Sequence, residues 1–448
     1  MSDLLAIGAS GVRAYQTALA TVGENIANVG STGYTRRTVQ VTEVPGGSGT
    51  VNQYGAGNGV NLTGIVRASD TYSSAALRAS TSDLNRTTQG ATWLDRVDGA
   101  LTGNALTTRM TSFFAAAQGL AAEPDSTALR TSMYSAANTL AVSFSATGAA
   151  FDQIEADIDT AGRQAATDLS SLGASLAGIN EGLGRAMPGS TAAAQLMDQR
   201  DQILGKMSEQ VDLSVSFDKL GRSTVSLAQS SGTPFVKGSM AGVVSYGRDD
   251  NGQATFAYTV NGVATQLSPN GGTLGGITDG AERVAANRQA LNGLAKDFVK
   301  TVNDNQAAGE DQNGVKGDDI FTVGTSPTAI TLAAGFTDGS KIAAAAPSGG
   351  KRDSSNLTLL AGLRQSKGFE TTLAGLITDN ATAYKQKSTI SDAQTAIRDG
   401  AATALSTATG VNLDSEAVDL MRFQQAYSAS SRVIQVARET MQSILDIR

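Results

Sequence analysis

Both ends of the chain carry apolar residues at helical spacing. Near the N-terminus, residues from Leu5 to Val29 recur in steps of three and four, which is the spacing of one face of an α-helix. Only Gly8 in this series is not a sizeable apolar residue. The same rhythm runs from Leu420 to Ile444 near the C-terminus. The pattern therefore predicts a long amphipathic helix at each end.

Helical spacing also occupies most of the interior. Glu123-Pro124 and Pro188-Gly189 interrupt it, because proline ends helices and disfavours helical geometry in the preceding residue. Residues 309–350 are rich in Gly, Asp and Ser and predict a long irregular excursion with one strand at 329–332. We expect helices over 77–101, 107–122, 127–179, 192–210, 278–303, 354–366 and 369–407.

The spacing of apolar residues changes from a helical period to an alternating one at the middle of the chain. From Leu213 to Phe217, apolar and polar residues alternate, as they do in a half-buried strand. Asp250-Asn-Gly252 and Asn261-Gly262 are strong signals for short hairpins. Residues 213–274 therefore predict a small, mostly antiparallel β domain.

These patterns predict a nested, mainly α fold with an inserted β domain. The N- and C-terminal helices form a coiled coil in an inner assembly domain, residues 1–65 plus 408–448. A long helical-bundle body comprises residues 66–212 plus 275–407, and the antiparallel β domain, 213–274, lies outermost.

Composition excludes much enzyme chemistry. The 448 residues include no His and no Cys, which removes disulfides, thiolate nucleophiles and imidazole bases or metal ligands. With 34 Lys and Arg against 41 Asp and Glu, the net charge is −7, so a nucleic-acid partner is not expected. No apolar stretch reaches the 18 residues of a membrane span, and the first residues lack the basic and apolar regions of a cleaved signal peptide.

Three kinds of local motif resemble functional sites but do not meet the requirements of those sites. Gly55–Gly59 lacks the third glycine of a phosphate-binding loop and is interpreted as a turn. Ser216–Lys219 and Ser348–Lys351 match a serine–lysine nucleophile pattern by chance. The acidic segment Glu310–Asp319 lacks a ligand that a calcium loop needs and is interpreted as structural. We expect no catalytic, cofactor-binding or metal site.

The terminal stripes are the candidate functional residues. An isolated helix pair is marginally stable in water, so we expect these helices to gain burial from other subunits and to become ordered on polymerisation. The predicted assembly residues are Leu5, Val12, Tyr15, Leu19, Val22, Ile26, Leu420, Phe423, Tyr427, Ile434, Met441 and Ile444.

Two segments near the N-terminus resemble a signature shared by rod, hook and junction proteins of the bacterial flagellum. The first is Asn25-Ile-Ala-Asn28 with Thr32-Gly-Tyr-Thr-Arg36. The second is Gly57-Asn-Gly-Val60 with Ile65-Val-Arg67 and Asp70. This signature identifies the superfamily and does not choose among its members.

Later segments resemble one family, the flagellar hook-associated proteins of the hook–filament junction. Hook and rod proteins generally carry Ala-Asn after the equivalent Ala-Tyr, whereas Ser428–Ser431 follows here. They also lack so much helix before the β insertion. The segments that carry the resemblance are Phe113–Pro124, Leu196-Met-Asp-Gln-Arg-Asp201, Gly275-Gly276, Gly410–Asp414 and Phe423–Tyr427.

The resemblance implies a structural subunit of the flagellum that forms the junction ring between hook and filament and is required for filament attachment. The implied partners are other copies in the ring, the hook protein, the second hook-associated junction protein, an export chaperone at the C-terminal helix and the flagellar export apparatus. The implied location is extracellular, at the hook–filament junction, after export without a cleaved signal peptide. Neither enzymatic activity, nor a cofactor, nor membrane insertion is expected.

The resemblance also assigns a role to the turn after the first helix. It implies that Asn25, Asn28, Gly33 and Tyr34 shape the connection between the inner helix and the outer body, with glycine supplying a backbone geometry that other residues resist. Because the chain is short for the family, we expect a second outer domain to be absent or reduced.

Two alternatives remain open. A hook or distal-rod axial protein would polymerise into a longer structure instead of a terminating ring. A flagellum-associated hydrolase would need a catalytic site, which the absence of His and Cys disfavours.

Overall fold

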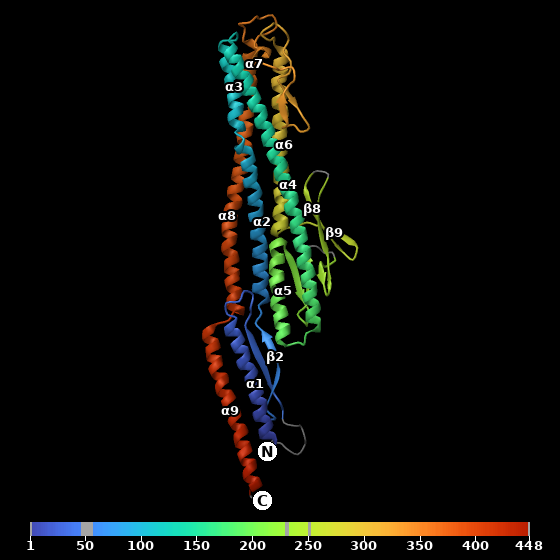
Figure 1. Ribbon diagram of the computed structural model, residues 1–448, viewed down its shortest axis with the longest axis vertical. Helices are drawn as coiled ribbons and strands as arrows, with labels where there is room; N and C mark the ends of the chain where they lie inside the picture. Colours follow the sequence, from blue (N-terminus) through green and yellow to red (C-terminus); the bar gives the residue numbers. More distant parts are fainter. Residues whose placement is uncertain (1, 46–56, 229–232, 250–251, 447–448) are drawn as a thin grey trace.

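The chain folds into an elongated, mainly helical molecule (Figure 1). The computed structural model describes residues 2–45, 57–228, 233–249 and 252–446. The first and last helices lie together at one end, and the long helices of the body extend away from them (Figure 1). This arrangement confirms the predicted fold class.

The terminal helices form an antiparallel pair. Helix α1 spans Ser2–Ala27 and helix α9 spans Leu413–Asp446, and the two lie side by side with both chain ends directed away from the body (Figure 1). Strands β1 (Arg37–Glu43) and β2 (Val60–Arg67) form an antiparallel hairpin that packs on α1.

The body is a bundle of long helices. Side chains cap three of its helices at their first turns: Asp70 caps α2, Ser126 caps α4 and Ser190 caps α5, so each satisfies backbone N–H groups that the helix leaves free. The helices are α2 (Thr71–Gly103), α3 (Leu106–Ala122), α4 (Thr127–Arg185), α5 (Thr191–Gln210), α6 (Gly272–Ala308), α7 (Ser355–Lys367) and α8 (Phe369–Thr409).

A cluster of phenylalanines holds the end of the body that lies farthest from the termini. Phe298 of α6 is fully buried. Its ring centroid lies 5.4–6.1 Å from five others, a spacing at which aromatic rings attract one another beyond their apolar burial. The five are Phe113, Phe114, Phe144, Phe321 and Phe369.

The β region lies against helix α4 (Figure 1). It contains two sheets, ordered β3-β4-β5-β6 and β7-β8-β9, and every neighbouring pair is antiparallel. The strands are β3 (Leu213–Phe217), β4 (Ser223–Leu227), β5 (Val236–Lys237), β6 (Met240–Ala241), β7 (Val243–Arg248), β8 (Ala254–Val260) and β9 (Val263–Leu267).

One of the two hairpin signals can be checked directly. Asn261 and Gly262 have φ angles of +51° and +79° and connect β8 to β9, as a two-residue hairpin turn requires. At the other signal, Asp250 and Asn251 lie outside the described residues. Strands β7 and β8 pair antiparallel on either side of them.

Several boundaries differ from the sequence prediction, among them the start of α2 at Thr71 and the end of α4 at Arg185. Helix α6 begins at Gly272 and not at Thr278, because contact with α2 holds Gly275 and Gly276 in a helix despite their low propensity. The excursion after α6 contains a hairpin of β10 (Phe321–Val323) and β11 (Ile330–Leu332), of which only the second strand was predicted, and a short 3₁₀ turn, η1 (Gly339–Lys341).

Gly276 allows α2 and α6 to approach closely, and its replacement tests this packing. A Cβ atom at Gly276 would lie 2.5 Å from Cβ of Gln89 and 2.7 Å from the backbone oxygen of Arg86. We expect Gly276→Ala to lower the free energy of unfolding by about 1–3 kcal/mol, because the helices must separate. Urea denaturation followed by circular dichroism measures this.

The matched control is Gly293→Ala in the same helix, where an added Cβ meets no atom within 4 Å. Alanine there should raise the free energy of unfolding by up to about 1 kcal/mol, because it favours the helix. Equal effects of the two substitutions would contradict the packing described.

Candidate functional site

Small residues bring the two terminal helices together. A Cβ atom at Gly8 would lie 2.7 Å from Cγ1 of Ile434. One turn further along α1, a Cβ atom at Gly11 would lie 2.7 Å from Oγ of Ser430. Both distances are shorter than atoms tolerate, so the helices can approach this closely only where α1 has no side chain.

The predicted apolar stripes therefore only partly coincide with the contact. Within α1, the buried positions include Gly8, Gly11, Ala14 and Ala18. The rings of Tyr15 and Phe423 meet across the pair with centroids 6.3 Å apart. Of the predicted assembly residues, Val22 is buried, Leu5, Val12, Tyr15, Leu19, Ile26, Leu420, Phe423 and Ile434 are half-buried, and Tyr427, Met441 and Ile444 are exposed.

Helix α9 keeps a large apolar surface in contact with solvent. Val418 and Val436 are 60% and 59% exposed, although valine side chains gain free energy when they leave water. Exposed apolar patches are typical of surfaces that contact proteins, membranes or ligands. The exposed large apolar residues of α9 are Leu413, Val418, Met421, Tyr427, Val433, Val436, Met441, Ile444 and Leu445.

Asn25 joins the terminal helices to the chain that follows them. Its amide is fully buried near the end of α1. Oδ1 accepts hydrogen bonds from the Tyr34 hydroxyl at 2.8 Å and the Arg37 backbone N–H at 3.0 Å. Nδ2 donates to the Arg37 backbone oxygen at 2.8 Å and to the Glu416 carboxylate at 2.9 Å. All four hydrogen-bonding positions of the amide are therefore used.

Glu416 connects the start of α9 to the same place. Its carboxylate is buried and accepts a hydrogen bond from Nε of Arg36 at 2.6 Å. The same guanidinium donates to Asp419 at 3.1 Å, and the backbone N–H of Arg36 donates to the oxygen of Thr409 at 2.9 Å. One arginine therefore holds the last residue of α8 and the first turns of α9.

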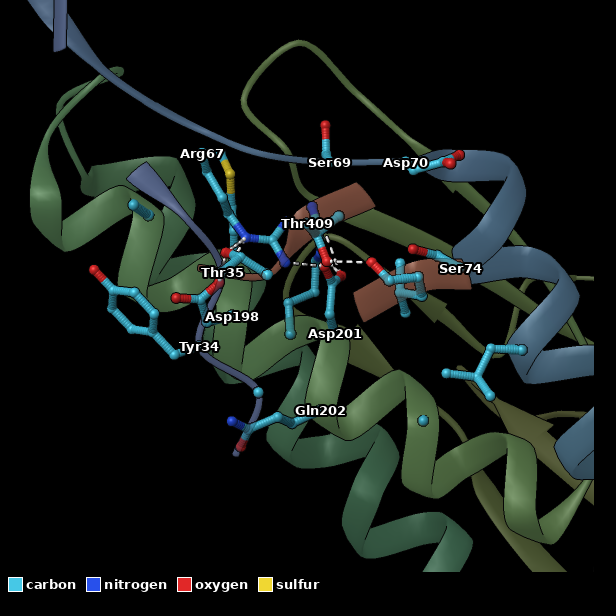
Figure 2. A pocket seen from close by; sticks show the side chains of 18 of the residues that line it. Tyr34, Thr35, Arg67, Ser69, Asp70, Ser74, Asp198, Asp201, Gln202 and Thr409 are labelled. Carbon is cyan, nitrogen blue, oxygen red and sulfur yellow. Dashed lines mark hydrogen bonds and ion pairs between the residues drawn. The ribbon is translucent and has the colours of Figure 1, made fainter. Parts of the chain in front are cut away.

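Asp198 of α5 holds the hairpin against the body. One carboxylate oxygen accepts from Arg37 at 2.9 Å, and the other accepts from Arg67 and from the Thr35 hydroxyl, both at 2.6 Å. The side chains of Arg37, Arg67 and Asp198 are each at most 9% exposed. Figure 2 shows Asp198, Arg67 and Thr35 converging from three segments, with Asp201, which binds Arg67 at 2.5 Å, beside them. We call this region, residues 33–37, 67, 198–202 and 409–419 with Asn25, the joint.

Three of the four predicted turn residues lie in the joint. Gly33 has a φ of +79°, and a Cβ atom there would collide with the side chain of Gln202. The ring of Tyr34 lies 4.7 Å from the Arg37 guanidinium, and burial raises the pKa of Tyr34 from its ordinary value. Asn28 is different, because its amide donates to the backbone of its own helix.

The charged residues of the joint had no assigned role in the sequence analysis. Arg36 and Arg67 stood in the N-terminal signature and Asp198 and Asp201 in a body segment, but the sequence does not pair them. Arg67 and Asp198 lie 131 positions apart. The sequence signal that could have identified them is the presence of these charged side chains within the two quoted segments.

One of the weaker motifs, the acidic segment Glu310–Asp319, has a structural explanation. Oδ1 of Asp311 accepts backbone hydrogen bonds from Asn313 at 2.7 Å and Val315 at 3.0 Å, so this carboxylate holds its own loop. Within the part of the chain that the structure describes, no cluster of three acidic side chains is placed to hold a metal ion, and no helix has the length and apolarity of a membrane span. Residues 55 and 56 of the glycine-rich segment lie outside the described residues.

Removing the central charge of the joint should destabilise the protein. In Asp198→Asn, two buried guanidinium groups lose their shared carboxylate, and breaking a buried ion pair from one side costs about 3–5 kcal/mol. We expect a loss of that size in the free energy of unfolding measured by urea denaturation.

Asp157→Asn is the control, because Asp157 pairs with Arg96 at the surface and exposed ion pairs contribute about 1 kcal/mol or less. If both substitutions cost the same, the buried carboxylate does not hold the joint.

Comparisons with known proteins identify the family. A family model described as the flagellar hook-associated protein FlgK helical domain matches residues 93–321, just over half of the chain. A second, described as the flagellar basal body rod FlgEFG protein C-terminal, matches residues 405–447.

Relatives and one solved structure are similar to the chain. The flagellar hook-associated protein 1 of Escherichia coli is 29% identical over 72% of the chain, and that of Salmonella typhimurium is 27% identical over 77%. The chain spans 60% and 65% of their lengths. The Bacillus subtilis protein of the same name is 24% identical over 97% of the chain and 96% of its own length.

The solved structure of the flagellar hook junction protein FlgK from Burkholderia pseudomallei matches with a TM-score of 0.51 at 24% identity, over 56% of the chain and 47% of that structure. It supports the fold alone. Because the helical-domain model covers residues 93–321, the chain belongs to the family of flagellar hook-associated proteins named FlgK.

Proposed function

We propose that this chain is a structural, non-catalytic subunit of the bacterial flagellum that forms the junction ring between hook and filament. The names of its relatives support this role. The observation that carries it is the terminal helix pair, which places both ends of the described chain together and leaves the 34-residue helix α9 with an exposed apolar surface.

The assembly mechanism is lateral packing of these helices. Helix α1 covers one side of α9, and a neighbouring copy covers residues such as Val418, Met421 and Val436 on its exposed surface. Burial of that surface stabilises the ring, since apolar side chains contribute about 25 cal/mol for each Å² removed from water. The half-buried members of the predicted stripes, such as Leu420, form the edge of this contact.

The chain acts as three units in this proposal. Residues 1–65 plus 408–448 form the inner assembly domain, residues 66–212 plus 275–407 the body, and residues 213–274 the outer β domain. The ion pair between Arg37 and Asp198, whose side chains are both buried, joins the first two units and supports a fixed orientation between them.

Partners and location follow from the role. The ring contacts the hook protein on one side and the second hook-associated junction protein on the other, outside the cell. The chain reaches this place through the flagellar export apparatus without a cleaved signal, and a chaperone holds the exposed apolar surface of α9 before assembly. That surface, unpartnered within the chain, supports the need for such a chaperone.

Charge placed on α9 should block assembly without unfolding the protein. In Leu420→Asp and Val418→Asp, a carboxylate enters the surface that a second copy must cover, whereas Val418 is exposed in the single chain. We expect at least a tenfold loss of the protein from purified hooks, measured by quantitative immunoblot. Leu359→Asp, an exposed site on α7 at the opposite end, is the control and should leave incorporation unchanged. Normal incorporation of both α9 variants would contradict lateral packing through α9.

Deletion of the protein tests the role itself. Electron microscopy of cells that lack it should show complete hooks without filaments, with free flagellin in the medium. The rod-protein match over residues 405–447 favours a hook or distal-rod subunit as the second candidate, and missing hooks would support that candidate. Normal filaments would overturn both.

A further inference from the structure

A groove lies where the body meets the joint, and residues of both line it. Helix α2 forms its floor, α5 and α8 form its walls, and residues 31–35 close its lower end. Its volume is about 1540 Å³. Figure 2 views this groove from close by, with Ser74, Asp201 and Thr409 contributed by the three helices.

Each of the three helices lines the groove with residues that lie three or four positions apart, which is the spacing of one helix face. On α2 the stripe runs over 14 positions, which corresponds to about 21 Å of helix at 1.5 Å per residue. Its apolar members, Leu77 and Leu84, are half-buried, so each keeps part of its surface in contact with solvent. The stripes are Ser74, Leu77, Thr81, Leu84 and Thr88 on α2, Ala194, Met197, Asp201, Gly205 and Ser208 on α5, and Arg398, Ala402, Leu405 and Thr409 on α8.

The groove also holds guanidinium groups with unused donors. Arg78 lines it and forms no hydrogen bond or ion pair with any described residue, and burial lowers the pKa of Arg78 from its ordinary value. Arg67 and Arg200 already occupy both carboxylate oxygens of the nearby Asp201. Across the groove, Nε of Arg398 is buried without a partner among the described residues.

We infer that this groove receives a helix of a second copy of the chain, which places a carboxylate against Arg78. The inference rests on the proposed ring. Two observations favour a second copy. Gly410 and Val411 line the groove, so it is continuous with the exposed apolar surface of α9 that begins at Leu413. The chain also carries 41 carboxylates against 34 basic residues, which supplies the complementary charge.

Gly205 offers a way to fill the groove without disturbing the fold. A Cβ atom at Gly205 meets nothing within 4 Å, so in Gly205→Phe the ring enters the space that the incoming helix needs. We expect at least a tenfold loss of the protein from purified hooks, with a thermal unfolding midpoint of the purified chain no lower than before. Gly119→Phe, at a half-buried helical glycine that also has free space, should leave incorporation unchanged and should not lower the midpoint either. Incorporation of Gly205→Phe equal to that of Gly119→Phe would overturn the inference.

A photo-crosslink identifies the occupant. Benzoylphenylalanine replaces Thr88, which is exposed at the edge of the groove, and intact hooks are irradiated. The expected product joins two copies of this chain, with the second attached through a helical peptide. Its yield should fall about tenfold in Arg78→Gln and stay constant in Arg109→Gln, an exposed arginine on α3. A product with another protein, or no product between copies, overturns the inference.

The two proposals fail differently. If the protein is present in hooks and no crosslink between copies forms, the groove inference is wrong and the junction role stands. If the wild-type protein is absent from hooks, the junction role fails and the inference that rests on it fails too.

Discussion

The buried carboxylate of Asp198 is the contact on which the arrangement of the molecule depends. It is shared by Arg37, the first residue of β1, and Arg67, the last residue of β2. A charge removed from water is tolerated only when opposite charges and hydrogen bonds surround it. The orientation of the terminal helices relative to the body is therefore set by a few polar atoms, and small shifts of these atoms would leave charges unpaired.

Apolar packing serves a different purpose at each end of the molecule. The phenylalanine cluster around Phe298 is completed inside the chain, whereas α9 keeps residues such as Val418 and Val436 in water. Between α1 and α9 the closest approach occurs at Gly8 and Gly11, beside the ring contact of Tyr15 with Phe423. The apolar side chains of Val418 and Val436 remain largely exposed beside this contact.

The sequence predicts the periodic elements well and the contacts between distant segments poorly. The spacing from Leu5 to Val29 and from Leu420 to Ile444 identifies both terminal helices, but not that the exceptional Gly8 marks their contact. The start of α6 was missed, because the low propensity of its glycines is outweighed by packing on α2. Asn25 and Tyr34 were placed by resemblance. Their partner Glu416 lies 391 positions from Asn25, and no local pattern encodes that pairing.

The route of the chain through the joint has a mechanical consequence. The backbone crosses between the terminal helices and the body twice, once from β2 into α2 and once from α8 into α9. The backbone of Arg36 binds both crossings, because its N–H donates to the oxygen of Thr409 at 2.9 Å and its oxygen accepts from the N–H of Ala68 at 2.8 Å. Any bending of the terminal helices relative to the body would therefore strain the two crossings together, and the two connections resist it as one unit.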